Sequence, residues 1–262
     1  MKKLMSILFV GLISVLLLGC QNDVVNTWDE IEERGYFVVG LDDTFAPMGF
    51  RDSDGELIGF DVDLAREVGR RLDIEVRFQS IDWDAKVLEL NSGAIDMIWN
   101  GLTITESRQE EMLFSVPYIA NTQMIMVRNG SEIDLLTDLS AKRVGVQVSS
   151  ASEEAVIASD IDNDFSEFLK YDNYNLALLE LQNNTVDAIV IDEIMGRYIM
   201  SQSPGIYQAA SDNFGSEEYG VGFRLDSVDI RDQINLILQE MITDGKASEI
   251  SIEWFGEDIF LR

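Results

Sequence analysis

Apolar residues recur along the chain with the spacing of a strand in some segments and with the spacing of a helix in others, and the two kinds of segment alternate. Residues 36–41 (YFVVGL) form a short apolar run typical of a buried strand, whereas 60–72 (FDVDLAREVGRRL) repeat apolar residues at helical spacing. A strand over 74–80, a short helix over 84–90 and a strand over 94–99 are predicted next. This alternation favours an α/β fold with a largely parallel sheet.

The second half of the chain repeats this plan. Its predicted strands and helices alternate in the same way over 142–148, 149–158, 167–171, 176–182, 186–191 and 193–201, and 229–244 predict a last amphipathic helix. Each half closes on nearly the same phrase, LELNSGAIDMIWNG at 88–101 and LELQNNTVDAIVID at 179–192. We therefore expect two similar α/β lobes, with Asp96 and Asp187 of the doubled phrase in structural turns rather than in a ligand site.

Two β-rich segments, 115–127 and 218–225, predict paired hinge strands that cross between the lobes. The first lobe is then discontinuous: we expect it over 27–120 and 222–262, and the second lobe over 121–221. Ligands of open parallel sheets bind beyond the carboxyl ends of the strands. Two such lobes facing each other predict a ligand cleft between them.

The chain begins with MKKLMSILFVGLISVLLLGC, two lysines followed by an apolar run over 4–18. This pattern is typical of a secretory signal peptide, and the run is short for the alternative, a transmembrane helix. Its end, LLGC, resembles the bacterial lipobox, in which the cysteine carries a lipid; a buried free thiol at Cys20 is the alternative. We expect a signal peptide over 1–20 and a protein anchored through Cys20 at the extracytoplasmic face of the cell membrane.

Composition removes several classes of function. The 262 residues contain no histidine and one cysteine, which excludes Ser-His-Asp and Cys-His catalysis, imidazole metal sites and an intramolecular disulfide. The formal net charge of −29 repels nucleic acid and anionic lipid heads. We expect a tethered, monomeric protein with no cofactor, no metal site and no nucleic-acid partner.

The residues at the predicted strand ends have the chemistry of a receptor for a zwitterion. Arg108 presents a fork of donors that matches a carboxylate, and Asp192 can bind an ammonium group. Phe45 and Trp83 can enclose a side chain, whose polar tip Asp42 can bind. The candidate site comprises Asp42, Phe45, Trp83, Asn100, Gly101, Thr103, Arg108, Gln147, Ser150, Ala151 and Asp192.

Each of these residues also has a simpler interpretation. Arg108 follows an acidic helix start and is compatible with a surface ion pair. Thr103 fits a capping box, and Asp192 precedes a predicted helix that it can cap. Phe45 and Trp83 are compatible with core or rim positions.

The segment GFDVDLAREVGRRL at 59–72 resembles the signature of the polar-amino-acid class of bacterial extracellular solute-binding proteins, which serve ABC importers. The resemblance extends from about Thr27 to the C-terminus through DDTFAPMGF, NGLTITESR, FSVPY, VGVQ and DAIVID, in that order. It implies two α/β lobes joined by two hinge strands, a free amino acid as ligand and a membrane permease as partner. The resemblance assigns the ligand's α-carboxylate to Arg108 with help from Thr103, and its α-ammonium group to Asp192.

Phe45 and Trp83 stand at the aromatic positions of this family, and Asn100 and Gly101 where residues contact the ligand through the backbone. The loop after Gln147 departs from the frequent Gln-x-Gly-Ser/Thr pattern, since Ser149 replaces glycine and Ala151 lacks a hydroxyl group.

Two other functions are compatible with the same scaffold: a cyclohexadienyl-dehydratase-like enzyme, with a carboxylic acid as general acid, and an extracellular sensor module. Among ligands, cystine, glutamine and the basic amino acids all remain open.

Overall fold

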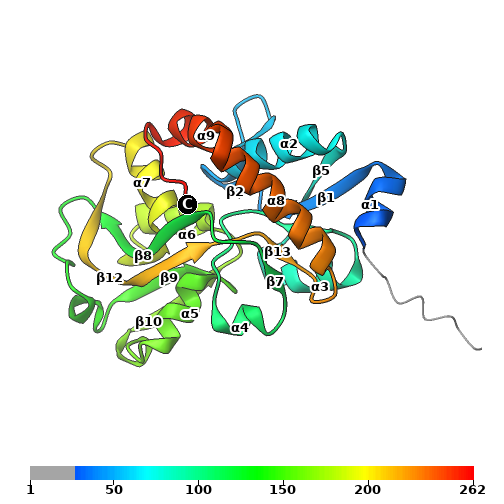
Figure 1. Ribbon diagram of the computed structural model, residues 1–262. Coiled ribbons are helices and arrows are strands. Elements are labelled where there is room, and N and C mark those ends of the chain that lie inside the picture. The colour runs from blue at the N-terminus through cyan, green and yellow to red at the C-terminus, as the bar shows by residue number, and fades with distance from the viewer. Residues whose placement is uncertain (1–26) are drawn as a thin grey trace, which may run out of the picture.

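Figure 1 shows the computed structural model, which describes residues 27–262. The expected signal peptide and Cys20 lie outside the described residues. Two five-stranded sheets and the helices that cover them form two lobes, with the early strands and the C-terminal helices in one lobe and the middle of the chain in the other. The expected α/β fold of two similar lobes is confirmed.

The first lobe is built on a sheet of order β5-β1-β6-β13-β7. The bounds of its strands are β1 (Tyr36–Leu41), β5 (Glu75–Ser80), β6 (Met97–Ile98), β7 (Leu113–Phe114) and β13 (Gly222–Phe223). Strand β1 pairs in parallel with β5 and β6, and β13 lies antiparallel between β6 and β7. Its helices are α1 (Trp28–Arg34), α2 (Phe60–Leu72), η1 (Trp83–Ala85), α3 (Lys86–Ser92), α4 (Glu106–Gln109), α8 (Val228–Asp244) and α9 (Lys246–Phe255). A small sheet of β2 (Thr44–Phe45), β3 (Gly49–Arg51) and β4 (Leu57–Ile58) completes this lobe.

The second lobe repeats the plan with a sheet of order β10-β9-β11-β8-β12. The bounds are β8 (Ile119–Arg128), β9 (Arg143–Gln147), β10 (Glu167–Tyr171), β11 (Ala188–Asp192) and β12 (Tyr207–Tyr219). Strands β10, β9 and β11 are parallel, and β8 lies antiparallel between β11 and β12. The helices here are η2 (Leu136–Leu139), α5 (Ala151–Ala158), η3 (Asp162–Asp164), α6 (Tyr174–Gln182) and α7 (Glu193–Gln202).

The doubled phrase is the same helix–strand unit in both lobes, α3–β6 in the first and α6–β11 in the second. In the first lobe, Asp96 accepts a hydrogen bond from the backbone N–H of Val38 at 2.7 Å and pairs with Arg34. In the second, Asp187 accepts from the backbone N–H of Arg143 at 2.9 Å and from its guanidinium. Each aspartate thus ties the last parallel strand to the first, the structural role expected of it.

The chain passes between the sheets from β7 to β8 and from β12 to β13, and the two passages are joined where Tyr118 N–H donates to Tyr219 O at 2.9 Å. The first passage agrees with the predicted hinge strand, which begins at Ile119 rather than at 115. The second differs, because the long strand β12 precedes it and residues 207–217 carried no strand prediction. The register of β12 shifts twice against β8, and such bulges interrupt the alternation by which strands are recognised.

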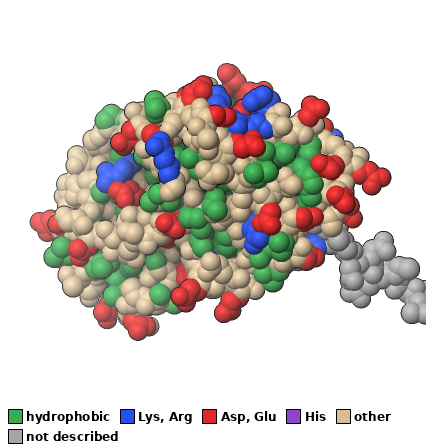
Figure 2. Space-filling view, viewed as in Figure 1, with side chains coloured by type: hydrophobic (Ala, Val, Ile, Leu, Met, Phe, Trp, Pro, Cys, Tyr) green, Lys and Arg blue, Asp and Glu red, His purple; other side chains and the backbone are tan. Residues whose placement is uncertain are grey.

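Acidic side chains outnumber basic ones on the face of the molecule shown in Figure 2. In the part of the chain that the structure describes, no helix combines the length and the apolar character that a membrane span requires.

Candidate functional site

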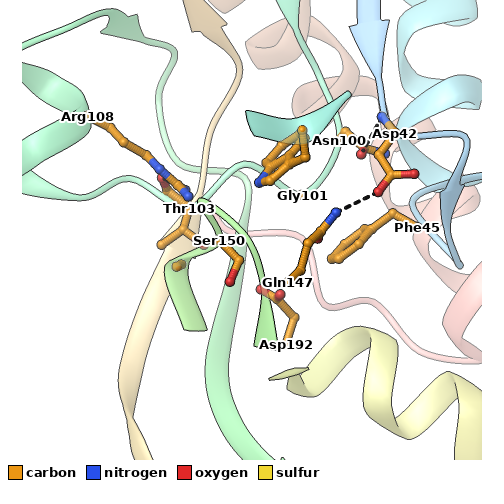
Figure 3. A pocket seen from close by; sticks show the side chains of 11 residues that line it. Asp42, Phe45, Asn100, Gly101, Thr103, Arg108, Gln147, Ser150 and Asp192 are labelled. Atoms are coloured by element: carbon orange, nitrogen blue, oxygen red, sulfur yellow. Dashed lines mark hydrogen bonds between the residues drawn. The ribbon is translucent and has the colours of Figure 1, made fainter. Parts of the chain in front are cut away.

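One pocket between the lobes brings all the predicted site residues together. With the lobes closed, the space left inside it is small, about 10 Å³. Figure 3 shows the side chains of its lining converging from both lobes, with Arg108 on one side and Asp192 on another. The lining consists of Asp42, Phe45, Trp83, Asn100, Gly101, Thr103 and Arg108 of the first lobe and Gln147, Ser150, Ala151 and Asp192 of the second.

Arg108 is buried, with 5% of its surface exposed, at the end of the short helix α4. Its Nη1 donates to Thr103 O at 2.9 Å and its Nη2 to Ser149 O at 3.2 Å. No carboxylate of residues 27–262 forms an ion pair with it, and burial lowers the pKa of its guanidinium. The surface ion pair is therefore the wrong interpretation: Arg108 is a desolvated cation whose hydrogen-bond partners are carbonyl oxygens, and the carboxylates of Glu154, Glu217 and Asp192 act on it only from beyond ion-pair distance.

Thr103 is buried but is not a helix cap, because the side chain of Thr105 caps α4 by accepting from Arg108 N–H at 3.3 Å. The Thr103 hydroxyl instead donates to Glu217 Oε1 at 2.8 Å, across the pocket wall.

Asp192 ends β11 at the N-cap position of α7, but its side chain makes no capping hydrogen bond. Its Oδ1 instead accepts from Asn121 Nδ2 at 2.7 Å, Gln123 Nε2 at 3.0 Å and the Tyr219 hydroxyl at 2.7 Å. Burial, and then the charge of Glu217, raise the pKa of Asp192 from 3.8 to about 7. The second oxygen, Oδ2, has no hydrogen-bond partner among the described residues, which leaves it available to a ligand.

Helix α5 begins at Ala151, two residues later than predicted, because the side chain of Ser150 caps it by accepting from Glu153 N–H at 3.1 Å. Ser149 has φ = +56°, in the left-handed region that glycine adopts most readily. Ser149 thus adopts a conformation that suits glycine, and Ser150 and Ala151 at the start of α5 line the same pocket as Arg108.

Asp42 and Gln147 join the two lobes, since Gln147 Nε2 donates to Asp42 Oδ2 at 2.9 Å. Asp42 Oδ1 accepts from the backbone and hydroxyl groups of Thr44, and Asn100 Oδ1 accepts from Asp42 N–H at 3.1 Å. The adjacent Asp43 lies outside the lining and pairs with Arg51.

Phe45, Trp83 and Gly101 form the apolar wall of the pocket. Both aromatic side chains are less than a tenth exposed, and Phe45 contacts the ring of Tyr174 in the second lobe. Gly101 has φ = +57° and its N–H donates to the buried Asp61 at 2.6 Å, which positions the Asn100–Thr103 loop.

Two charged residues near the pocket were missed by sequence reasoning. Glu217, on β12, accepts hydrogen bonds beside Asp192. Lys86, on α3, is 5% exposed and donates to Trp83 O and to Ser149 O. The sequence holds one overlooked signal for Glu217, the segment SEEY. Glu217 and Tyr219 are two residues apart in it and therefore lie on one face of a strand, and both side chains reach the Asp192 network.

The lobes are closed on each other. Lys86, Thr103, Arg108 and Gln147 make the inter-lobe hydrogen bonds described above, and Ser107 Oγ donates to Glu154 Oε1 at 2.6 Å at the rim. Within residues 27–262, no group of acidic side chains is arranged to hold a metal ion.

Comparison with known proteins agrees with this geometry. A family model described as bacterial extracellular solute-binding proteins, family 3, matches residues 37–257. The L-cystine-binding protein TcyJ of Escherichia coli is 28% identical over 260 residues, which cover 98% of this chain and 96% of TcyJ.

Among solved structures, an ABC uptake transporter substrate-binding protein from Streptococcus pneumoniae with bound histidine has a TM-score of 0.87 and 34% identity, over 90% of this chain and 98% of that one. ArtJ from Geobacillus stearothermophilus, which binds arginine, lysine and histidine, has a TM-score of 0.78 and 33% identity, over 85% and 96% of the two chains. All three are binding proteins, so the comparisons do not favour the dehydratase alternative.

Proposed function

Because this chain belongs to family 3 of the bacterial extracellular solute-binding proteins, we propose that it captures a free, polar L-amino acid in the pocket between its lobes and delivers it to an ABC transporter permease. The observation that carries the proposal is the pairing of charges across one pocket. Arg108, a buried cation without a carboxylate partner among the described residues, and Asp192, with one carboxylate oxygen unpartnered, enter it from opposite lobes.

The ligand's α-carboxylate binds Arg108, Thr103 and the first N–H groups of α5, and its α-ammonium group binds Asp192. Phe45 and Trp83 enclose the side chain, Asp42 and Gln147 bind its polar end, and Asn100, Gly101, Ser150 and Ala151 complete the walls. Micromolar affinity corresponds to about −8 kcal/mol. Two charge-assisted anchors of about 1.5–3 kcal/mol each, with the burial of the side chain, are of that order.

The test is a calorimetric screen of the common L-amino acids and cystine against the purified protein. We expect one polar amino acid, or a small group of them, to bind at about micromolar or lower Kd, and Arg108→Ala to lose the binding at least 100-fold, about 3 kcal/mol. The matched control is Arg197→Ala, which removes an exposed arginine paired with Glu193 on α7. A screen in which no amino acid binds the folded protein contradicts the proposal.

Binding is accompanied by closure of the two lobes, for which we keep the boundaries 27–120 with 222–262 and 121–221. Each lobe contains one of the two five-stranded sheets, and the described part of the chain passes between these two sheets only twice, which supports the division. Small-angle X-ray scattering tests it: the radius of gyration falls when the ligand is added to the monomer.

The anchoring is proposed to depend on Cys20, which becomes the lipidated N-terminus when the signal peptide before it is cleaved; this places the protein on the extracytoplasmic face of the membrane. An alkyne-labelled fatty acid is then incorporated by the wild-type protein and not by Cys20→Ser, which is released from the membrane fraction. Incorporation that persists in Cys20→Ser contradicts this part of the proposal.

A further inference from the structure

The carboxylates of Asp192 and Glu217 share the same two hydrogen-bond donors. Asn121 Nδ2 lies 2.7 Å from Asp192 Oδ1 and 2.6 Å from Glu217 Oε1. Gln123 Nε2 lies 3.0 Å and 2.7 Å from the same two oxygens. Two side-chain amides of β8 therefore hold two acidic groups side by side, one at the end of β11 and the other on β12.

This acidic pair has no ion-pair partner among the described residues. The titratable groups that face Asp192 are Tyr219 of β12, Tyr174 of α6 and Arg108 of α4. Both tyrosines are neutral near pH 7, since burial raises their pKa values further. Arg108 acts only over a longer range, because its guanidinium is bonded to carbonyl oxygens. Neighbouring carboxylates in such surroundings do not ionise together without cost.

We propose that Asp192 and Glu217 hold one proton between them in the ligand-free protein, and that the ammonium group of the ligand takes its place. This inference rests on the amino-acid-binding function proposed above and adds a coupling of binding to proton release. Two adjacent carboxylates require a positive charge that offsets their repulsion. A proton supplies it before binding, and the ligand's ammonium group supplies it afterwards.

The proton is placed on Asp192 because that side chain is the more deeply buried of the two, 5% exposed, whereas Glu217 is only partly buried. Glu217 Oε1 accepts from three donors, Thr103 Oγ1 and the two amides, and Asp192 Oδ1 also accepts from three. Asp192 Oδ2 has no partner among the described residues and is where a carboxylic acid carries its proton. On binding, the O–H bond of Asp192 breaks, the proton goes to solvent, and an N–H of the ligand's ammonium group donates to the carboxylate. A pKa of about 7 for Asp192 is consistent with this position.

The pair does not depend on closure of the lobes. Strands β8, β11 and β12, which carry both acids and both amides, belong to one sheet. Opening of the cleft removes the contact with Thr103 and leaves the two carboxylates together, so the proton is present in the state that first meets the ligand.

Calorimetry with a ligand found in the screen tests the coupling, in two buffers of different ionisation enthalpy. At about pH 6 we expect release of close to one proton per ligand bound, and at about pH 8.5 close to none. The Kd is expected to rise roughly tenfold for each pH unit below 7. Equal apparent enthalpies in the two buffers at pH 6 overturn the inference, whereas absence of any ligand counts against the proposed function instead.

Glu217→Gln keeps the size of the side chain and removes its charge. The change lowers the pKa of Asp192, so we expect proton release at pH 6 to fall and the onset of weaker binding to move to lower pH. The control is Glu218→Gln, the exposed neighbour on the same strand, which should behave as the wild type. Wild-type proton release in Glu217→Gln contradicts the proposal.

A measurement without ligand keeps the inference testable by itself. Carbon-13 NMR of labelled aspartate carboxyl groups, with Asp192 assigned through Asp192→Asn, should show a titration well above the ordinary range in the wild type and a lower one in Glu217→Gln. An Asp192 that titrates near 4 in the wild type overturns the inference.

Discussion

The ammonium group of Lys86 lies 2.9 Å from the carbonyl oxygen of Ser149 and so joins the first lobe to the second. Arg108 donates to the same oxygen at 3.2 Å. Two cations of one lobe thus converge on a single backbone acceptor of the other, and the left-handed conformation of Ser149 presents that acceptor. Burial, and then the charge of Arg108, lower the pKa of Lys86 to about 7.

Replacement of this lysine should shorten the lifetime of the closed complex. Lys86→Met fills a similar volume but has no donor, and we expect the ligand to dissociate roughly tenfold faster with little change in association rate. Stopped-flow fluorescence measures both rates. The control is Lys246→Met, which removes a lysine of α9 that is 33% exposed and paired with Glu249. Unchanged dissociation in Lys86→Met would show that the contact does not hold the lobes together.

Gly101 tests how closely the pocket wall is packed. A Cβ atom there would lie 2.9 Å from Phe45 Cε1 and 3.1 Å from Tyr219 Cε2, at φ = +57°. We expect Gly101→Ala to weaken ligand binding about tenfold or more, since Phe45 must move. Gly130→Ala is the matched control, because its φ is +80° and its Cβ would meet open space. Both variants carry the backbone strain, so equal ligand affinities would refute the packing argument.

The aspartates of the doubled phrase should matter for stability and not for binding. Asp187→Ala leaves the backbone N–H and the guanidinium of Arg143 without their acceptor, so we expect the free energy of unfolding to fall by about 1–3 kcal/mol. Urea denaturation measures this loss, and calorimetry should give a ligand Kd within about twofold of the wild type. A large loss of affinity in a folded Asp187→Ala protein would place this residue in the site after all.

Asp61 gives a pH dependence of stability whose sign follows from its pKa. Burial raises that pKa from 3.8 to about 7, so the folded state binds the proton more tightly than the unfolded state. The contribution of protonated Asp61 to the free energy of unfolding is complete below about pH 4 and is lost as the pH rises to about 7. Asp61→Asn does not titrate, so the free energy of unfolding of the wild type relative to this variant should fall by on the order of 3 kcal/mol between pH 4 and 7. Urea denaturation across this range measures it, and a flat difference contradicts the assigned burial.

The fold followed closely from periodicity, because β1, α2 and β10 have the residues that their patterns predict. The pocket lining could be predicted because most of its residues stand where strands end or helices begin, positions that the order of elements already locates. Glu217 could not be placed in this way. It lies on a bulged, largely polar strand, and only antiparallel pairing with β8 brings it to Asp192. Lys86 stands at the start of a short helix, and its contact with Ser149 of the opposite lobe is one that no local pattern reveals.

Strand β13 occupies an inner position of the first sheet although it lies near the C-terminal end of the chain. During synthesis or export the chain emerges from its N-terminus, so this sheet lacks an inner strand until Phe223 has appeared. All five strands of the other sheet are complete by Tyr219. The half of the molecule that is made first therefore receives the last strand of its sheet after the other sheet has all of its strands, and until then β6 and β7 have unpaired edges of the kind that chaperones protect.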